Sequence, residues 1–214
     1  MTTTSISTLD ALRHLGAATV YEAQGAKGAF DSAIKPIAAT MRVSGPALTV
    51  DIRPGDNLML HYAMLKAKPG DVLVVDAKGF LEAGPWGDVF TEQALHMGLG
   101  GLVINGAVRD ADAIIAAGFP VFCRGLSIKG TGKNQPGHLN VPITMAGVVV
   151  HPGDIIVGDQ DGLVVVAHQE AEMVLQKSLA REAKEIWFRE QIRNGANTVD
   201  LLGLAETLKR LNLN

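Results

Sequence analysis

Short apolar runs alternate with amphipathic segments through the middle of the chain. Such runs are typical of buried strands, whereas apolar positions spaced three and four residues apart indicate helices that cover a sheet. The runs predict strands at 43–52, 72–76, 102–104 and 120–123, and the periodic segments predict helices at 58–67, 88–97 and 111–117. The alternation of strand and helix predicts an α/β domain.

Beyond a glycine-rich segment at 125–137, the pattern changes. It predicts short strands at 148–150, 155–157 and 163–166, with Asp161-Gly162 as a hairpin turn between the last two. Hairpins beside a strand–helix alternation favour a mixed central sheet, and we expect this domain to span 1–167. A long helix at 168–193 and a last helix at 199–211 have no obvious place on it, so 168–214 is predicted to pack on a neighbouring subunit.

Composition narrows the classes of function. The 214 residues carry a net charge of −3 with no basic block, which argues against nucleic acid and anionic membranes as partners. No apolar run approaches the roughly 20 residues of a membrane span, and the start of the chain lacks the pattern of a signal peptide. The lone Cys123 excludes an internal disulfide and fits a reducing compartment. We therefore expect a cytoplasmic protein that acts on a small molecule.

Arg109 and Asp110 follow the apolar run 102–104 directly after a loop of small residues. A carboxylate can hold a hard divalent cation, and a guanidinium beside it can neutralise an oxyanion on a bound ligand. The simpler explanation is that Asp110 caps the helix predicted at 111–117 and that Arg109 pairs with a surface acid.

Asp88 stands at the start of another predicted helix, after Gly84-Pro85-Trp86-Gly87. Free N–H groups at a helix N-terminus suit a carboxylate or a phosphate, although Asp88 could simply cap its helix. Two such loops after successive strands point to one ligand site, because ligands of α/β sheets gather at the C-terminal ends of the strands.

The segment 127–134 contains Lys129 and Lys133 and resembles a phosphate loop, but it has serine where the first glycine of the Walker motif belongs. We therefore reject a nucleotide site. The two lysines could still meet an anionic substrate, although solvated loop lysines are the simpler account. The six histidines show no metal-ligand spacing.

Three further residues have ordinary explanations. Glu22 could complete a capping box with Thr19, and Asn57 could cap the helix that follows it. Glu185 lies four residues before Arg189, which favours a surface ion pair on the long helix.

Taken together, the chain resembles the class II pyruvate aldolases of the RraA-like fold, a swivelling β/β/α domain. The resembling segments are ATVYEAQGAKGAFDSAIKPI, GPALTV, PGDN, GFPVFCRG, HPGDIIVGDQDGLVVV and the motif Asp-x20-Arg-Asp formed by Asp88, Arg109 and Asp110. The spacing of this motif separates the aldolases from the regulators of RNA degradation that share the fold.

The resemblance implies a divalent metal, Mg²⁺ or Mn²⁺. Asp110 would bind it directly, and Asp88, Glu22 and Glu185 would hold its waters, with the two glutamates coming from a neighbouring subunit of a homotrimer or homohexamer. A metal-bound water is the expected proton carrier. Some relatives carry an acid at the position of Ala113, which leaves the role of that acid open here.

The resemblance also implies residues for catalysis and substrate binding. Arg109 and Asp88 would be catalytic, with Arg109 against the enolate oxygen and the amides of 84–88 on the pyruvyl carboxylate. The residues expected to contact the substrate are Gly84, Pro85, Trp86, Gly87, Asp88, Arg109, Asn57 and Lys133.

The implied activity is a lyase of aromatic-compound catabolism (protocatechuate 4,5-cleavage, gallate degradation). It would cleave 4-hydroxy-4-methyl-2-oxoglutarate and/or 4-carboxy-4-hydroxy-2-oxoadipate to pyruvate plus pyruvate or oxaloacetate through a metal-bound pyruvate enolate. Oxaloacetate decarboxylation is expected as a side activity. Two alternatives stay open: a protein that is mainly an oxaloacetate decarboxylase, and a non-catalytic ribonuclease regulator.

Overall fold

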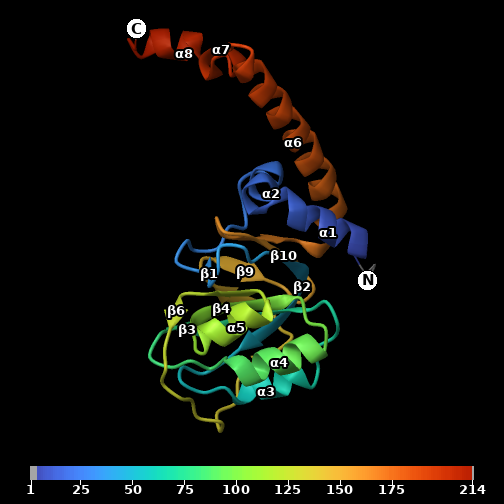
Figure 1. Ribbon diagram of the computed structural model, residues 1–214, viewed down its shortest axis with the longest axis vertical. Helices are drawn as coiled ribbons and strands as arrows, with labels where there is room; N and C mark the ends of the chain where they lie inside the picture. Colours follow the sequence, from blue (N-terminus) through green and yellow to red (C-terminus); the bar gives the residue numbers. More distant parts are fainter. Residues whose placement is uncertain (1–3, 214) are drawn as a thin grey trace.

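A mixed sheet of nine strands runs through the centre of residues 4–213, the part of the chain that the computed structural model describes (Figure 1). Four neighbouring strands are parallel: β2 (Val43–Asp51), β3 (Val72–Phe80), β4 (Gly101–Val108) and β5 (Val121–Cys123). The antiparallel pair β10 (Ile155–Gly158) and β11 (Leu163–Val166) extends the sheet beyond β2. The predicted α/β domain with a mixed sheet is confirmed.

Short strands complete the sheet. They are β1 (Lys35–Pro36) against β5, β6 (Gly125–Leu126) against β4, and β7 (His138–Leu139) against β2. A separate hairpin consists of β8 (Ile143–Met145) and β9 (Val148–Val150) and packs with Phe30 and Ile34 against one face of the parallel strands.

Three helices cover the other face and connect the parallel strands: α3 (Leu58–Met64), α4 (Asp88–His96) and α5 (Ala111–Ala117). Their core is built around Trp86, whose ring stacks on Phe90 at 5.0 Å and on Phe119 at 5.9 Å between centroids. Because Trp86 lies in the loop before α4 and is fully buried, this stacking fixes the loop to the core.

A third layer lies on β10 and β11. It contains α1 (Ile6–Leu15), α2 (Ala17–Ala23) and the start of α6 (Ala171–Arg193), which follows the 3-10 turn η1 (His168–Glu170). The last buried residue of α6 is Ser178, and beyond it the helix projects from the body as an arm that ends in α7 (Thr198–Leu201) and α8 (Ala205–Arg210) (Figure 1). In the described part of the chain, no helix is long and apolar enough to cross a membrane.

The structure corrects the bounds of two predicted helices. The helix predicted at 58–67 ends at Met64, because the N–H groups of Leu65 and Lys66 bond three residues back and tighten the chain toward Pro69. The helix predicted at 199–211 is two helices, because Gly203 adopts a left-handed φ of 65°.

Candidate functional site

The loop before α4 and the turn before α5 meet at the C-terminal edge of the parallel strands. The N–H of Asp88 donates to Oδ2 of Asp110 at 3.2 Å, and the N–H of Arg109 donates to the carbonyl of Trp86 at 2.9 Å. The three polar residues of the Asp-x20-Arg-Asp motif therefore lie together.

Two glycines permit this close approach. A Cβ atom on Gly87 would collide with Oδ2 of Asp110 and approach Nε of Arg109 to 3.0 Å. A Cβ atom on Gly84 would lie 2.9 Å from Cβ of Arg109 and 2.5 Å from the carbonyl of Ser127. Larger residues at either position would separate the loop from the motif.

Asp110 occupies the position before α5, but its side chain makes no capping hydrogen bond. Its φ is 58°, a left-handed conformation that aspartate tolerates better than most residues, at a cost of about 1 kcal/mol or more. The carboxylate is turned toward the neighbouring loop, with Oδ2 at 3.3 Å from Nε of Arg109. The helix-cap explanation is therefore wrong for Asp110.

The amides of the loop 84–88 are only partly available to a ligand. The N–H of Gly84 donates to the carbonyl of Lys129 at 2.9 Å, and that of Asp88 is bound to Asp110. Pro85 has no N–H, and the described residues offer no acceptor to the N–H groups of Trp86 and Gly87. Of the amides of 84–88 that were expected to hold a carboxylate, only those of Trp86 and Gly87 are therefore available.

Asp88 is the first residue of α4 and is exposed to solvent. Its Oδ1 accepts a hydrogen bond from the N–H of Val89 at 2.7 Å, so the cap explanation is partly right for this residue. Within the described residues, Oδ2 of Asp88 has no hydrogen-bond partner, and the backbone N–H of the same residue contacts the carboxylate of Asp110.

A pocket of about 330 Å³ adjoins this junction. Its lining consists of Asn57, His61, Pro85, Gly87, Val89, Phe90, Gln93, Arg109, Gly130, Thr131 and Lys133. Two cationic side chains, those of Arg109 and Lys133, therefore line one cavity, which suits an anionic ligand.

Asn57 does not cap α3 with its side chain. Its Nδ2 donates to the carbonyl of Pro85 at 3.0 Å, and because that oxygen can only accept, the orientation of the amide is settled. Oδ1 of Asn57 is buried and has no hydrogen-bond partner within the described residues. An orphaned acceptor in a pocket calls for a donor from a ligand or a bound water.

Asp56 holds the glycine-rich segment that carries Lys133. Its carboxylate accepts hydrogen bonds from the N–H groups of Leu58 and Asn134, both at 2.9 Å, and of Gln135 at 3.2 Å. Burial raises the pKa of Asp56, but these backbone donors and Lys133 outweigh it, so the pKa lies below its usual value. Lys133 is thereby fixed at the pocket even though it stands in an irregular segment.

His61 is a pocket residue that the sequence analysis missed. It lies one helical turn after Asn57, and its ring is 4.6 Å from that of Phe90. Burial and the nearby charge of Lys133 lower the pKa of His61, so the imidazole is neutral near pH 7. His61 stands four residues after Asn57, and this spacing is the sequence pattern that could have indicated that both residues face one pocket.

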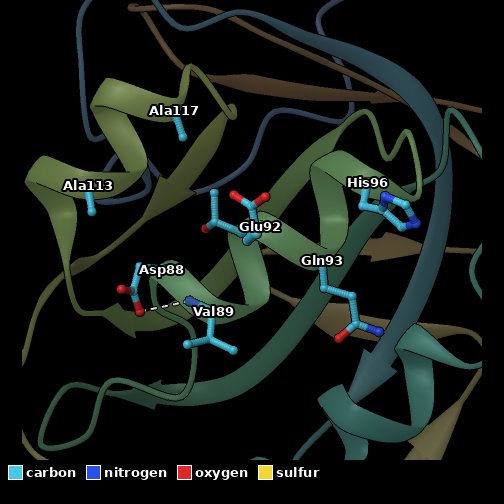
Figure 2. Close-up of a pocket in the computed structure, with 8 residues that line it drawn as sticks. Asp88, Val89, Glu92, Gln93, His96, Ala113 and Ala117 are labelled. Carbon is cyan, nitrogen blue, oxygen red and sulfur yellow. Dashed lines mark hydrogen bonds between the residues drawn. The ribbon is translucent and has the colours of Figure 1, made fainter.

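A wider groove of about 680 Å³ runs between α4 and α5 (Figure 2). On α4 it is lined by Asp88, Glu92 and His96, each four residues apart, and on α5 by Ala113 and Ala117. Asp88 thus borders this groove, and Ala113 lies in its wall.

Glu22 and Glu185 meet in a second cluster, between α2 and α6. Arg181 lies between them, with Nη1 at 3.6 Å from Glu22 and Nε at 3.1 Å from Glu185. The capping box of Thr19 and Glu22 is wrong, because α2 begins at Ala17 without a side-chain cap. The predicted pair of Glu185 with Arg189 is present at 3.6 Å.

This cluster lies on the layer of α2 and α6, at the other end of the body from α4 and α5 (Figure 1). Within one chain, the residues predicted for the site therefore form two groups: Asp88, Arg109 and Asp110 in one, Glu22 and Glu185 in the other.

The donor set of the first group fits a hard divalent cation. Mg²⁺ is commonly held by one or two carboxylates together with waters, and Asp88 and Asp110 supply two carboxylates at one exposed place. Within residues 4–213 of a single chain, no three His, Cys, Asp or Glu side chains gather closely enough to hold a metal.

Comparison with known proteins gives a consistent family. The family model described as RraA-like, Aldolase/RraA, matches residues 10–165. A protein of Halalkalibacterium halodurans named "Putative 4-hydroxy-4-methyl-2-oxoglutarate aldolase" is 45% identical over 154 residues, which cover 72% of this chain and 73% of that protein.

Solved structures agree. A crystal structure of a protein from Pseudomonas syringae pv. tomato has a TM-score of 0.83 at 30% identity and covers 94% of this chain and 99% of its own. Streptomyces coelicolor RraAS2, described as a member of the RNase ES inhibitor RraA family, has a TM-score of 0.76 at 27% identity, covering 88% of this chain and 98% of its own. The chain therefore belongs to the RraA-like (Aldolase/RraA) family.

Proposed function

We propose that this protein is a divalent-metal-dependent carbon–carbon lyase. It cleaves 4-hydroxy-4-methyl-2-oxoglutarate and/or 4-carboxy-4-hydroxy-2-oxoadipate to pyruvate plus pyruvate or oxaloacetate. The observation that carries the proposal is the junction of Asp88 with Asp110, beside Arg109, at a pocket that also contains Lys133. The name of the 45% identical relative supports the same reaction.

The pocket suits a 2-oxo acid with a second carboxylate. The N–H groups of Trp86 and Gly87 are the amides available for the carboxylate next to the keto group, and Arg109 lies beside them. Lys133 is the cation for the second carboxylate. The two carboxylates of 4-hydroxy-4-methyl-2-oxoglutarate match the two cationic side chains on this cavity.

The reaction breaks the bond between C3 and C4 of the substrate. The hydroxyl on C4 loses its proton and becomes the carbonyl of the second product, while the bonding electrons move to the C2 oxygen and give an enolate. Arg109 stabilises that developing oxyanion, and C3 then takes up a proton to give pyruvate. A divalent cation held by Asp110, with waters held by Asp88, would supply Lewis-acid polarisation of the 2-oxo acid. Oxaloacetate would lose CO₂ through the same enolate.

We further propose that the site is completed by a neighbouring subunit of a homotrimer or homohexamer. Glu22 and Glu185 are held together by Arg181 on the layer that bears the projecting arm, so one neighbour delivers both glutamates as a unit. Contact with the neighbour would also bury exposed apolar side chains of the arm, such as Ile186 and Trp187.

A pyruvate-release assay tests the reaction. Purified protein with Mg²⁺ or Mn²⁺ is given each of the two aldol substrates and oxaloacetate. Pyruvate from an aldol substrate at a higher kcat/KM than from oxaloacetate supports the lyase. Faster turnover of oxaloacetate would make the protein mainly a decarboxylase, and no pyruvate from any substrate would favour the ribonuclease-regulator alternative.

A further inference from the structure

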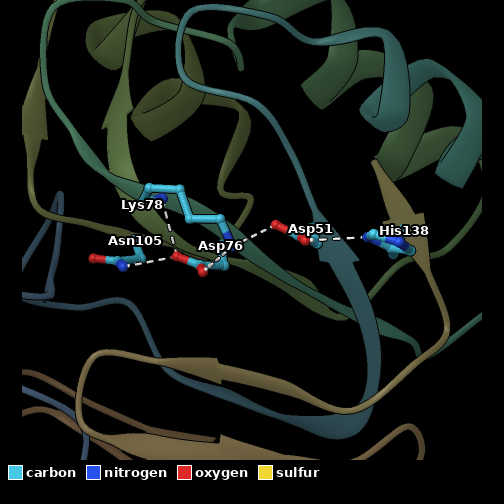
Figure 3. Close-up of polar contacts among 5 residues, drawn as sticks. All are labelled: Asp51, Asp76, Lys78, Asn105 and His138. Carbon is cyan, nitrogen blue, oxygen red and sulfur yellow. Dashed lines mark hydrogen bonds and ion pairs between the residues drawn. The ribbon is translucent and has the colours of Figure 1, made fainter. Parts of the chain in front are cut away.

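A row of polar side chains crosses the C-terminal ends of the parallel strands (Figure 3). Asp51 of β2 stands opposite Asp76 of β3 in the strand register, and Nδ2 of Asn105 on β4 donates to Oδ1 of Asp76 at 2.8 Å. Arg124, directly after β5, donates from Nε to Oδ1 of Asn105 at 2.5 Å. The row therefore ties four neighbouring strands to one another at the same level.

Each strand of this row leads into a segment of the candidate site. The chain passes from Asp51 to Asn57, from Asp76 to the loop 84–88, from Asn105 to Arg109 and Asp110, and from Arg124 to Lys133. The relative positions of the four segments thus depend on how the four strand ends are held together.

Lys78 is the cation at the centre of the row. Its Nζ lies 2.5 Å from Oδ1 of Asp51 and 2.7 Å from Oδ2 of Asp76, and its N–H donates to Oδ1 of Asp76 at 3.0 Å. Asp76 is 4% exposed, so its carboxylate is buried and receives donors from both Lys78 and Asn105. His138 adds a contact at 3.3 Å to the outer side of Asp51.

The backbone at Lys78 is a bulge in β3. The pairing of β3 with β4 shifts register between Val75 and Phe80, and Lys78 and Gly79 both have left-handed φ angles, 59° and 70°. A lysine in this conformation is uncommon, and its cost requires compensation from the surroundings. The contacts of the Lys78 side chain and N–H with Asp51 and Asp76 provide it.

This bulge sets the course of the chain into the loop 84–88. Between Val75 and Phe80, β3 advances five positions while β4 advances two, from Ile104 to Gly106.

Lys78 keeps its positive charge in this bulge. Burial disfavours the charged form of Lys78, but its hydrogen bonds with the two aspartates outweigh this and raise its pKa, so the ammonium is retained. The position of the anion-binding amides is therefore coupled to a charged side chain that does not touch the pocket.

We propose that Lys78 is a positioning residue, which pins the bulge of β3 to Asp51 and Asp76 and so holds the loop 84–88 against Arg109 and Asp110. The part of this inference that concerns KM and kcat rests on the proposed function. It predicts that loss of the Lys78 ammonium weakens substrate binding more than it slows the chemical step, because Arg109 directly follows β4, which also pairs with β5 and β6 away from Lys78.

The experiment compares Lys78→Met with Lys78→Arg, which keeps the charge. Lys27→Met is the matched control, since Lys27 forms an ion pair of 2.9 Å with Glu170 that is also partly exposed but lies away from the row. Asp51→Asn removes the charge of one partner of Lys78 and serves as the milder variant should Lys78→Met not fold. Each protein is measured for KM and kcat of pyruvate release, for Tm, and for hydrogen–deuterium exchange of the segments 80–88 and 155–166.

We expect Lys78→Met, or Asp51→Asn to a smaller extent, to raise KM about tenfold while kcat changes less than about threefold. Exchange should accelerate in 80–88 and not in 155–166, Lys78→Arg should restore both readouts, and Lys27→Met should change neither. A lower Tm with unchanged KM and unchanged exchange in 80–88 would overturn the proposal, because Lys78 would then contribute to stability alone. If the wild-type protein releases no pyruvate at all, the proposed function fails, and the exchange of 80–88 still decides the role of Lys78.

Discussion

Asp88 and Asp110 lie 22 positions apart in the chain and are joined by one hydrogen bond of 3.2 Å from the backbone N–H of the first to the carboxylate of the second. The bond places two carboxylates at one edge of the sheet, with Asp88 at the start of α4 and Asp110 directly before α5. Gly87 makes this contact possible, since any side chain there would enter the space of Asp110.

Replacement of Gly87 tests the closeness of this junction. In Gly87→Ala, the added methyl group collides with Asp110 and Arg109, and we expect kcat/KM to fall about a hundredfold, the effect of misplacing a catalytic group by roughly 1 Å. Gly125→Ala is the matched control, because a Cβ there meets only a side-chain atom of Leu81 at 3.8 Å. Equal kcat/KM in the two variants would show that the junction is not needed.

Removal of the Arg109 guanidinium tests its role at the developing oxyanion. We expect Arg109→Ala to lower kcat by about 10²–10³-fold, as for the loss of an oxyanion donor. Arg42→Ala, which removes an exposed arginine whose guanidinium bonds to the carbonyls of Arg13 and His14, should leave kcat unchanged. Rates for Arg109→Ala within twofold of the wild type would refute the assignment.

The sharing of the site between subunits is tested by mixing variants. Because Arg181 holds Glu22 and Glu185 on the same chain, Glu22→Ala and Glu185→Ala subunits cannot repair one another. Glu185→Ala and Arg109→Ala subunits can repair one another. At a site between them, the first supplies an intact Arg109 and the second supplies intact Glu22 and Glu185.

After an equal mixture of these two variants is unfolded and refolded together, about a quarter of the sites regain both halves, and we expect about a quarter of wild-type activity. The mixture of Glu22→Ala with Glu185→Ala is the control and should stay inactive. If the first mixture also stays inactive, the shared site loses its support.

The pH dependence of substrate binding tests the pocket around His61. Its pKa lies below the usual 6.5 because burial and Lys133 disfavour the charged imidazole. A second carboxylate bound beside Lys133 offsets that charge and raises the pKa of His61, so by linkage the diacid binds more tightly as pH falls from 6.5 toward the pKa of the free protein.

We therefore expect KM for the diacid substrate to decrease as pH is lowered through this range. The dependence should disappear in His61→Asn, and the inhibition constant of pyruvate, which has one carboxylate, should not show it. A KM for the diacid that is the same in this range in the wild type and in His61→Asn would contradict the position of the second carboxylate.

The sequence was sufficient for much of the fold. Continuous apolar runs marked β2 to β5, and Asp161-Gly162 marked the hairpin of β10 and β11, because both patterns follow from local burial and turn geometry. The end of α3 at Met64 was not predicted, because the apolar spacing continues to Ala67 and does not show the tightened turn at Leu65 and Lys66.

The candidate site was predicted only in part. Spacing brought Asp88, Arg109 and Asp110 together, but the contact of Arg181 with Glu22 joins residues far apart in sequence on two helices, and no local pattern shows it. The bulge at Lys78 was equally hidden, because lysine is not a residue that predicts a left-handed backbone.

We propose that this chain breaks a carbon–carbon bond with the help of a divalent cation held at Asp88 and Asp110. The most direct measurement is the rate of pyruvate release from 4-hydroxy-4-methyl-2-oxoglutarate or 4-carboxy-4-hydroxy-2-oxoadipate before EDTA, after EDTA, and after addition of excess Mg²⁺. We expect pyruvate release before EDTA, its loss in EDTA, and its recovery after addition of Mg²⁺. Release that continues unchanged in EDTA, or no release under any of the three conditions, would contradict it.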